Sequence, residues 1–301
     1  MANWRRHLGL QGKSRFQLGL CVQPDHIDCV QLKANDRSVL TSASLPTPSL
    51  ADWVRESKCN QADCVLTLAP NQYQLLQIEK PAVADSELRE AVRWKIKDQI
   101  EFDPGEAAID VFHAPPSRQQ GRPATVFVAA AQKSELVPML DQIASAGLNT
   151  WKIDITELAL RNLSERLAAD VTVAVVYLSE PRGLIQIARN ETLFLARRMD
   201  VSLDRLQPSE TSHDAWEALT LDVQRTMDYY DSNTGGAPVK RVLVAPPSQA
   251  HPALISTLGV GLGIPVEAFD TAPLMNAPEQ AGDGLLAALG GALQTRNEAG
   301  S

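Results

Sequence analysis

The chain has 301 residues, of which 44% are hydrophobic and 21% are charged. This balance is typical of folded globular proteins and excludes a chain that is mostly disordered or collagen-like. The length predicts two domains of ordinary size, or one duplicated fold with a cleft. The net charge is −8, and because the first 15 residues hold four basic groups and no acid, the rest of the chain carries −12. Such an acidic body excludes a nucleic-acid partner, because nucleic-acid affinity depends on neutralising phosphates with Lys and Arg.

The apolar runs are too short to cross a membrane. The longest, which begin at Ala124 and Gly284, span about ten residues or fewer, whereas a spanning helix needs roughly 20. The basic N-terminus is not followed by the apolar region of a signal peptide. We therefore expect a cytoplasmic protein in which the cysteines are buried or bystander thiols, since none forms a Cys-x-x-Cys pair. The four cysteines are Cys21, Cys29, Cys59 and Cys64.

The first half of the chain is predicted to begin with three short strands joined by tight turns, which form a meander. In the clearest helix, Leu88, Val92 and Ile96 recur every four residues, and Asp85 can cap the N-terminus. The last helix of this half ends before Gly147, a suitable residue for a helix C-terminus. The predicted strands span 16–22, 27–34, 38–45, 64–69, 73–79, 108–112 and 124–131, and the helices span 49–57, 85–102 and 134–146.

The same pattern begins again at Trp151. Each half then has a three-strand meander, a helix, a strand and a helix, which indicates a duplicated α/β fold. This is the architecture of the actin, hexokinase and Hsp70 superfamily, in which ATP lies between two lobes. The predicted strands span 151–156, 171–178, 183–189, 191–198, 241–245 and 265–269, with helices through Arg161, from about 209 to 230, up to Leu262 and over 284–293.

This duplication predicts three parts. A basic tail covers residues 1–15. A first actin-like lobe of the ribonuclease H-like type covers 16–150 and includes an inserted subdomain at about 82–130. The second actin-like lobe covers 151–301, and the two lobes enclose a cleft.

Three strings of residues follow one another in the order expected for one known family. The first lies between Ser86 and Phe112, the second is Ala146-Gly147-Leu148 followed by Ile153-Asp154, and the third ends a long helix. The residues that carry the first string are Glu87, Leu88, Ala91, Val92, Trp94, Ile100, Phe102 and Asp110, and those of the third are Asp222, Val223, Arg225, Met227, Asp228, Tyr229 and Tyr230. Together they resemble the PilM family of type IV pilus assembly proteins, particularly the MshI branch linked to MSHA pili.

The chain departs from this family at the first nucleotide element. Gly19 is kept, but Cys21 stands where the family has the Asp that holds a metal-bound water. Gln23 replaces a glycine, and Pro24 replaces a residue whose backbone N–H is needed, because proline has none. A thiol is also a poor ligand for Mg²⁺, which prefers carboxylate and water oxygens.

The other two elements are altered as well. In the second phosphate hairpin, Tyr177 replaces the family's Asp and Ser179 its Gly, and in the adenosine motif Pro246 and Pro247 occupy the place of two glycines. We therefore expect no ATP binding, no cofactor and no enzymatic activity. The carboxylates near these loops that remain as possible stand-in ligands are Asp25, Asp28 and Glu180.

No other motif predicts a catalytic or metal site. The five histidines form no i, i+4 pair of the kind found in zinc proteases, and no G-x-S-x-G motif is present. We therefore expect no bound metal.

The resemblance implies a partner surface on the inserted subdomain, and Trp94, Ile100 and Phe102 are the candidate contact residues. Trp is favoured at interface hot spots, although Trp94 at the margin of an apolar stripe is also compatible with an intramolecular contact. Tyr229 is expected to be exposed and Tyr230 to be buried. In the basic tail, Trp4, Arg5 and Arg6 are candidate membrane contacts, since basic residues are attracted to anionic lipid, and a solvated tail is the alternative.

The resemblance implies a cytoplasmic scaffold at the inner-membrane platform of a type IV, MSHA-type pilus. Such proteins bind the short cytoplasmic N-terminal segment of a PilN-like inner-membrane protein, in a groove beside the inserted subdomain, and further contacts reach the pilus assembly ATPase. Two alternatives stay open. One is a nucleotide-regulated ATPase of the PilM type, and the other is a GspL-like cytoplasmic domain of a type II secretion system.

Overall fold

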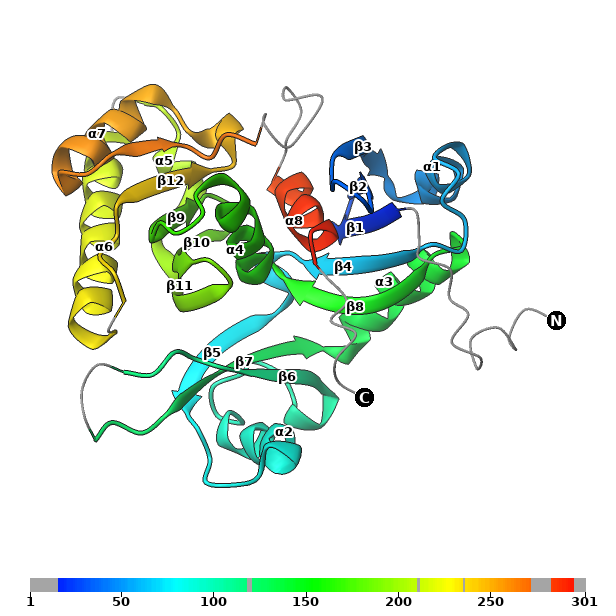
Figure 1. Cartoon of the computed structure of the whole chain (residues 1–301), viewed down its shortest axis with the longest axis horizontal. Coiled ribbons are helices and arrows are strands. Elements are labelled where there is room, and N and C mark those ends of the chain that lie inside the picture. Colours follow the sequence, from blue (N-terminus) through cyan, green and yellow to red (C-terminus); the bar gives the residue numbers. More distant parts are fainter. Residues whose placement is uncertain (1–15, 118–120, 210–211, 235, 272–282, 295–301) are drawn as a thin grey trace.

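The computed structural model describes residues 16–117, 121–209, 212–234, 236–271 and 283–294, which form two five-stranded sheets and one three-stranded sheet (Figure 1). The strands are β1 (Phe16–Val22), β2 (His26–Lys33), β3 (Val39–Pro46), β4 (Asp63–Leu68), β5 (Gln74–Glu79), β6 (Ala107–His113), β7 (Thr125–Gln132), β8 (Asn149–Ile155), β9 (Val173–Tyr177), β10 (Arg182–Arg189), β11 (Thr192–Ser202), β12 (Arg241–Ala245) and β13 (Val266–Ala268). The α-helices are α1 (Leu50–Glu56), α2 (Asp85–Lys95), α3 (Lys133–Ser145), α4 (Thr156–Leu167), α5 (Leu203–Leu206), α6 (Ser212–Asn233), α7 (Pro252–Leu262) and α8 (Asp283–Ala292). The described residues also form the short 3₁₀-helices η2 (Thr47–Ser49), η3 (Pro70–Gln72), η4 (Pro104–Glu106) and η5 (Pro247–Gln249).

The two large sheets have the same strand order, which confirms the predicted duplication. The first sheet runs β3-β2-β1-β4-β8 and the second runs β11-β10-β9-β12-β13. In each, three meander strands pair antiparallel and two later strands add in parallel. The central strands are buried almost along their whole length, because helices cover both faces of each sheet.

One predicted boundary differs from the structure. The strand that begins the second half of the sequence pattern, β8, pairs in parallel with β4 and is the fifth strand of the first sheet. The helix at the end of the pattern, α8, also packs on β1, β2 and β4 of the first sheet. Local periodicity predicted both elements but carries no information on which sheet they join, because strand and helix partners lie far away in sequence.

The small sheet β5-β7-β6 is inserted between β4 and α3, and α2 covers its apolar face. The predicted helix over 85–102 is wrong in its length, since α2 ends at Lys95 and turns follow. Ile96 and Ile100 pack in the same apolar cluster as Leu88 and Val92 of α2. The apolar residues therefore keep their four-residue spacing beyond the end of the helix. Asp85 does not cap α2 either, and its carboxylate instead accepts a hydrogen bond from Lys80 Nζ at 2.8 Å.

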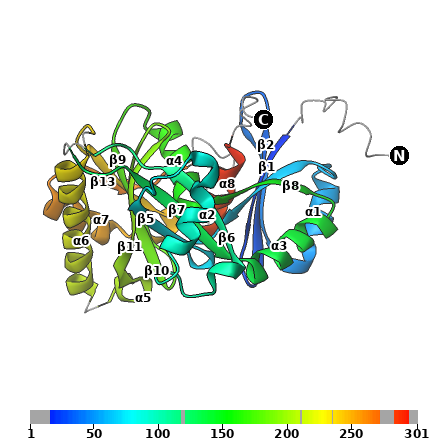
Figure 2. The same cartoon turned by 90° about the horizontal axis from the view of Figure 1, so that it is seen from below.

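Helices α4 and α8 lie side by side between the two large sheets, while α1 and α3 cover the outer side of the first sheet and α6 and α7 that of the second (Figures 1 and 2). One continuous apolar cluster joins the two halves, and we call it the interlobe core. Its members at the strand ends are Cys21, Ala69, Tyr177, Ala245 and Phe269, and α8 adds Leu285, Ala288 and Leu289. The two lobes are therefore packed against each other through buried side chains.

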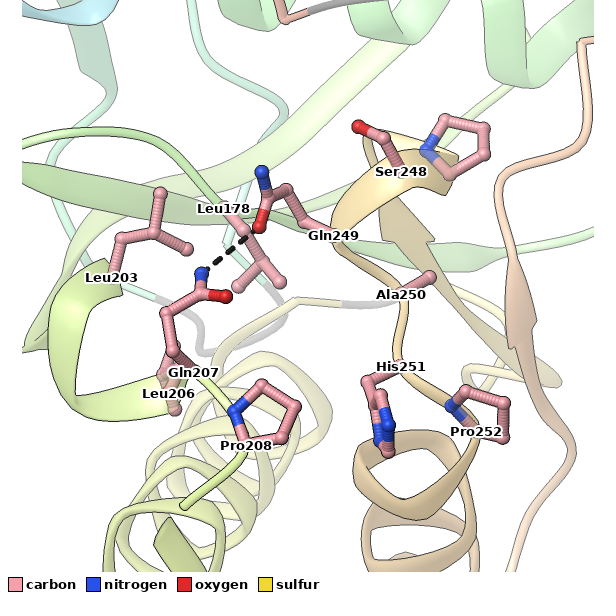
Figure 3. A pocket seen from close by; sticks show the side chains of 11 residues that line it. Leu178, Leu203, Leu206, Gln207, Pro208, Ser248, Gln249, Ala250, His251 and Pro252 are labelled. Atoms are coloured by element: carbon pink, nitrogen blue, oxygen red, sulfur yellow. Dashed lines mark hydrogen bonds between the residues drawn. The ribbon is translucent and has the colours of Figure 1, made fainter. Parts of the chain in front are cut away.

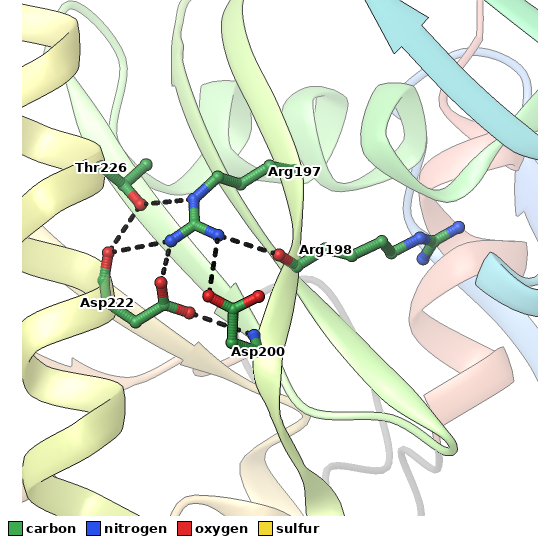
Figure 4. A network of polar contacts seen from close by, with 5 residues as sticks. All are labelled: Arg197, Arg198, Asp200, Asp222 and Thr226. Atoms are coloured by element: carbon green, nitrogen blue, oxygen red, sulfur yellow. Dashed lines mark hydrogen bonds and ion pairs between the residues drawn. The ribbon is translucent and has the colours of Figure 1, made fainter. Parts of the chain in front are cut away.

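Helix α6 attaches to the second sheet through its apolar stripe and one half-buried ion pair. Trp216, Val223 and Tyr230 are buried as predicted, and Tyr229 is exposed. The Arg197 guanidinium of β11 pairs with the carboxylate of Asp222, and its Nε donates to Thr226 Oγ1 at 2.9 Å (Figure 4). Asp222, which belongs to the third resembling string, thus has a structural role at this junction. No helix in the part of the chain that the structure describes combines the length and the hydropathy of a membrane span.

Candidate functional site

The three predicted nucleotide elements meet at one place, where β1, β9 and β12 end. The side chains of Cys21, Tyr177 and Ala245 belong to the same interlobe core. The backbone N–H of Leu178 donates to the carbonyl of Ala245 at 2.6 Å, which ties the turn after β9 to the turn after β12. The structure therefore brings together the elements that the sequence placed far apart.

Apolar packing fills the position at which the strand ends meet. Cys21 is 0% exposed and Tyr177 is 2% exposed, and both pack in the interlobe core. An acidic residue in place of either side chain would be buried among apolar groups, which is unfavourable without a compensating charge. The pair Cys21 and Tyr177 consequently supports a packed junction between the lobes.

Gly19 has a structural explanation. A Cβ at this position would overlap the carbonyl oxygen of Ala288 and would lie 2.7 Å from the backbone nitrogen of Ala292. Both atoms belong to α8, so a glycine lets this helix approach β1 closely. The glycine that matched the family's nucleotide motif thus serves helix packing in this chain.

The remaining residues of the first turn lie near the surface. Gln23 is half-buried, and its Nε2 lies 3.7 Å from Cys21 Sγ, while Pro24 is exposed. His26 stands between the two carboxylates of this turn, with its Nδ1 at 2.7 Å from Asp25 Oδ1 and its Nε2 at 3.3 Å from Asp28 Oδ2. Burial raises the pKa of the Asp28 carboxyl. No group of three His, Cys, Asp or Glu residues within the described ranges is arranged to hold a metal ion.

The turn after β9 and the turn after β12, which hold the second and third predicted nucleotide elements, border a cavity of about 420 Å³ (Figure 3). Ser179 and Pro246 are buried beside it, and the lining residues are Leu178, Leu203, Leu206, Gln207, Pro208, Pro247, Ser248, Gln249, Ala250, His251 and Pro252. None of them is Lys, Arg, Asp or Glu. Among the residues that the structure describes, the cavity lining therefore has neither a cation for a phosphate nor a carboxylate for a metal ion.

All four cysteines are buried, as predicted, and none of them forms a disulfide among the described residues. Burial raises the pKa of the Cys59 thiol to about 11 and that of the Cys64 thiol to about 12. These thiols are protonated at neutral pH, and protonated thiols are neither nucleophiles nor good metal ligands.

The predicted contact residues of the inserted subdomain separate into two kinds. Trp94 is 67% exposed on α2, which contradicts the interpretation of an intramolecular contact. Ile100 is buried in the core of the small sheet and Phe102 is half-buried against it, so these two support the fold and do not form an open contact surface. The physical reason is that their spacing continues the apolar stripe of α2. Trp4, Arg5 and Arg6 lie outside the described residues.

Sequence reasoning missed a polar link between the halves. Arg198 of β11 donates hydrogen bonds to the backbone carbonyls of Pro70 and Tyr73, and the Tyr73 hydroxyl donates to the carboxylate of Glu157 at the start of α4. Burial raises the pKa of the Glu157 carboxyl, and the positive charge of Arg198 acts in the opposite direction. No local spacing signals this link, because Arg198 and Tyr73 are 125 positions apart.

No protein-family model and no curated protein sequence matches the chain. Among solved structures, a chain of the PilM-PilN type IV pilus biogenesis complex is similar with a TM-score of 0.67 and 21% identity, over 92% of this chain and 97% of that one. The cytoplasmic domain of EpsL, an inner-membrane component of the type II secretion system of Vibrio cholerae, has a TM-score of 0.52 and 15% identity, over 92% and 95% of the two chains. A protein with an actin-like ATPase fold from Bacteroides thetaiotaomicron has a TM-score of 0.51 and 9% identity, over 87% and 93%.

The duplicated sheets with α4 and α8 between them define the actin-like ATPase fold, as predicted. The chain has this fold in the form found in the PilM-PilN complex, with which it is similar over nearly its full length.

Proposed function

We propose that this protein is a non-enzymatic scaffold of a type IV pilus assembly platform, located in the cytoplasm at the inner membrane. The observation that carries the proposal is the packing of Cys21 and Tyr177 in the interlobe core, within a fold that resembles a chain of the PilM-PilN complex. A protein that uses this fold to hold a partner does not need an open nucleotide site between its lobes.

The absence of ATPase activity belongs to this proposal. Mg-ATP bound between the lobes needs polar groups for its phosphates and a carboxylate for its metal-bound water. In this chain the strand ends meet through apolar side chains, and the backbone of α8 fills the space next to Gly19. The nucleotide-regulated ATPase is the second candidate, and it requires these packed elements to separate.

The proposed partner is the cytoplasmic N-terminal segment of a PilN-like inner-membrane protein. Trp94 offers a large exposed ring on α2, and an exposed Trp is a frequent anchor in interfaces. The exposed carboxylates of Glu87 and Glu90 lie seven and four residues before it on the same helix, which is helical spacing. An Arg of the partner segment would find both an aromatic face and negative charge there.

The finer points of the proposal rest on the resemblance of the sequence. They are membership of the MshI branch, service to an MSHA-type pilus and contact with the assembly ATPase. Attraction of Trp4, Arg5 and Arg6 to anionic lipid is a further part. The likeness to the EpsL cytoplasmic domain keeps a type II secretion platform as an alternative system for the same kind of scaffold.

The test is calorimetric titration of the full chain with a synthetic peptide that covers the cytoplasmic N-terminus of a PilN-like protein. We expect binding by the native chain and a loss of at least tenfold in affinity for Trp94→Ala, with an unchanged melting temperature because the ring is exposed. Tyr229→Ala is the matched control, since it removes another exposed aromatic side chain, on α6.

A peptide in which the Arg is replaced by Ala should bind more weakly, and moderate salt should reduce the difference by screening. Deleting residues 1–15 should leave peptide affinity intact and lower only recovery with anionic vesicles. Equal affinity of the native chain and Trp94→Ala would contradict the assignment of this surface, and absence of binding by the native chain would contradict the partner.

A further inference from the structure

Strand β3 forms one edge of the first sheet, and the scaffold proposal does not use this edge. Its neighbour in the sheet is β2, to which it pairs antiparallel. Within the described part of the chain, residues 40–45 make backbone hydrogen bonds with no other segment. In an antiparallel ladder every second residue directs its N–H and C=O away from the neighbouring strand. The side of β3 opposite β2 therefore presents a row of backbone donors and acceptors that the described residues leave unpaired (Figure 1).

The β3 edge differs from the other sheet edges in charge. Residues 41–45 are Thr-Ser-Ala-Ser-Leu, a stretch with neither a charged residue nor a proline. Proteins commonly protect an open edge with charged side chains or proline, because an unprotected edge pairs with another strand. The other edge strands of the three described sheets each carry at least one charged residue, namely Glu79 in β5, Asp110 in β6, Lys152 in β8, Arg197 in β11 and Glu267 in β13.

The regular part of the β3 edge has its midpoint at Ala43. The pairing with β2 changes register at Leu40, and Pro46 has no N–H to donate. The regular stretch between these two positions is residues 41–45, and Ala43 is its middle residue. Two copies of the chain related by a two-fold axis at this position would pair antiparallel and show the same face of the sheet.

The side chains that would meet across this axis are small and compatible. Ala43 would lie opposite Ala43 of the second copy, Ser42 opposite Ser44, and Thr41 opposite Leu45. The serine hydroxyls can hydrogen-bond to each other, which is a favourable cross-strand pair. Ser44 is exposed, while Ser42 and Ala43 are half-buried, so the edge is open to an approaching strand. The sequence of this edge is therefore complementary to itself.

Charge also favours this edge as the place where two copies meet. Each copy carries a net charge of −8, so two copies repel each other at a distance. Like charges directly opposite each other in a strand pair add to such repulsion at close range. The stretch 41–45 adds none, because it is uncharged.

We infer that two copies of this protein pair through their β3 edges, antiparallel about Ala43, so that their first sheets form one continuous sheet. The inference goes beyond the scaffold proposal, because the contact lies on the first sheet and Trp94 on α2 takes no part in it. Figure 1 shows β3 and α2 well apart in the molecule. The dimer presents the surface around Trp94 twice, once on each copy.

The test is sedimentation velocity of the full chain over a series of protein concentrations. We expect a reversible equilibrium of monomer and dimer with a micromolar dissociation constant, because a contact through one strand pair is small. Moderate salt should strengthen the dimer by screening the repulsion between two acidic copies. Salt should have the opposite effect on the peptide binding of the scaffold proposal, so failure of one proposal can be told from failure of the other.

Ser44→Lys places on β3 the kind of charge that the other edges carry. In the dimer the two introduced lysines would be diagonal neighbours, about 7–8 Å apart, and we expect the dissociation constant to rise at least tenfold. Ser256→Lys is the matched control, since it makes the same change on an exposed serine of α7 and should leave the dimer intact. Both variants reduce the negative charge of the chain equally, and melting curves verify that both fold.

The double variant Ser42→Glu/Ser44→Lys tests the register. Because Ser42 lies opposite Ser44 of the second copy, each introduced lysine would face an introduced glutamate, and we expect the dimer to be recovered. Ser42→Glu alone should weaken the dimer as Ser44→Lys does. A loss of dimer that came from misfolding would not be reversed by a second substitution.

Three outcomes would overturn the inference. The first is a native chain that stays monomeric over the whole concentration series. The second is a dimer that Ser44→Lys does not weaken, which would place the contact on another surface. The third is a folded Ser42→Glu/Ser44→Lys variant that stays monomeric, which would exclude pairing about Ala43.

Discussion

The Arg198 guanidinium lies over the Tyr73 ring, with 5.5 Å between Cζ and the ring centroid, and this contact joins the second large sheet to the chain that enters the small sheet. Arg198 also donates hydrogen bonds to the carbonyls of Pro70 and Tyr73. A hydrogen bond to a charged group contributes more than a neutral one, about 1.5–3 kcal/mol. Arg198 is therefore a fixed connection between the lobes.

Replacing this side chain should destabilise the whole protein. We expect Arg198→Ala to lower the free energy of unfolding by about 2–4 kcal/mol, because it removes the hydrogen bonds and leaves buried acceptors unpaired. Arg198→Lys should recover part of this loss, since Lys keeps the charge but not the fork of donors. Urea denaturation measures both, with the exposed Arg205→Ala as a control expected within about 0.5 kcal/mol of the native chain. An Arg198→Ala variant as stable as that control would refute the connection.

Glu157 gives the protein a pH dependence whose sign follows from its surroundings. Burial raises the pKa of its carboxyl above the ordinary value of 4.5, so the folded chain holds this proton more tightly than the unfolded chain does. The stability gained from the protonated form is complete below 4.5 and is lost as the pH rises through the raised pKa. Each unit by which the pKa is raised corresponds to about 1.4 kcal/mol.

We therefore expect Glu157→Gln, which still accepts a hydrogen bond from Tyr73, to gain stability relative to the native chain as the pH rises. Guanidinium denaturation at pH 4.5, 6 and 8 gives the comparison. The free energy of unfolding of the variant minus that of the native chain should increase from the lowest to the highest pH. A difference that stays constant, or that decreases with pH, would show that Arg198 keeps the carboxylate charged.

Cys21 tests whether the family's carboxylate fits into this chain. We expect Cys21→Asp to lose about 3 kcal/mol or more of stability, because a carboxyl group would enter the apolar interlobe core. Cys21→Ala, which removes the thiol without adding a polar group, should lose less. Thermal unfolding of the two variants makes the comparison, and a Cys21→Asp variant that is as stable as the native chain and is further stabilised by Mg-ATP would contradict the packed junction.

The duplication was predictable because it rests on local signals. The apolar strands around Leu20 and Val175, the turns between them and the helix stripe of α6 each appear within a short window of sequence. Which sheet β8 and α8 join was not predictable, since pairing between β8 and β4 depends on residues far apart in the chain. The length of α2 was overestimated because Ile96 and Ile100 keep the apolar spacing after the helix has ended.

In the candidate site, too, some features could be predicted from the sequence and others could not. The positions of Cys21 and Tyr177 could be identified from the repeated pattern and the resemblance, and the structure places both in one cluster. The role of Gly19 in the contact with α8 and the link from Arg198 to Tyr73 could not be read from the sequence. Each of these depends on two segments that only the tertiary fold brings together.

The central claim is that apolar packing has replaced the nucleotide site, and thermal unfolding with millimolar Mg-ATP tests it most directly. A ligand at about 100 times its dissociation constant adds about 2.7 kcal/mol of stability, which would raise the melting temperature of a chain of this size by several degrees. The account predicts the same melting temperature with Mg-ATP as with Mg²⁺ alone. An increase of several degrees that requires the nucleotide would contradict it and favour the nucleotide-regulated ATPase.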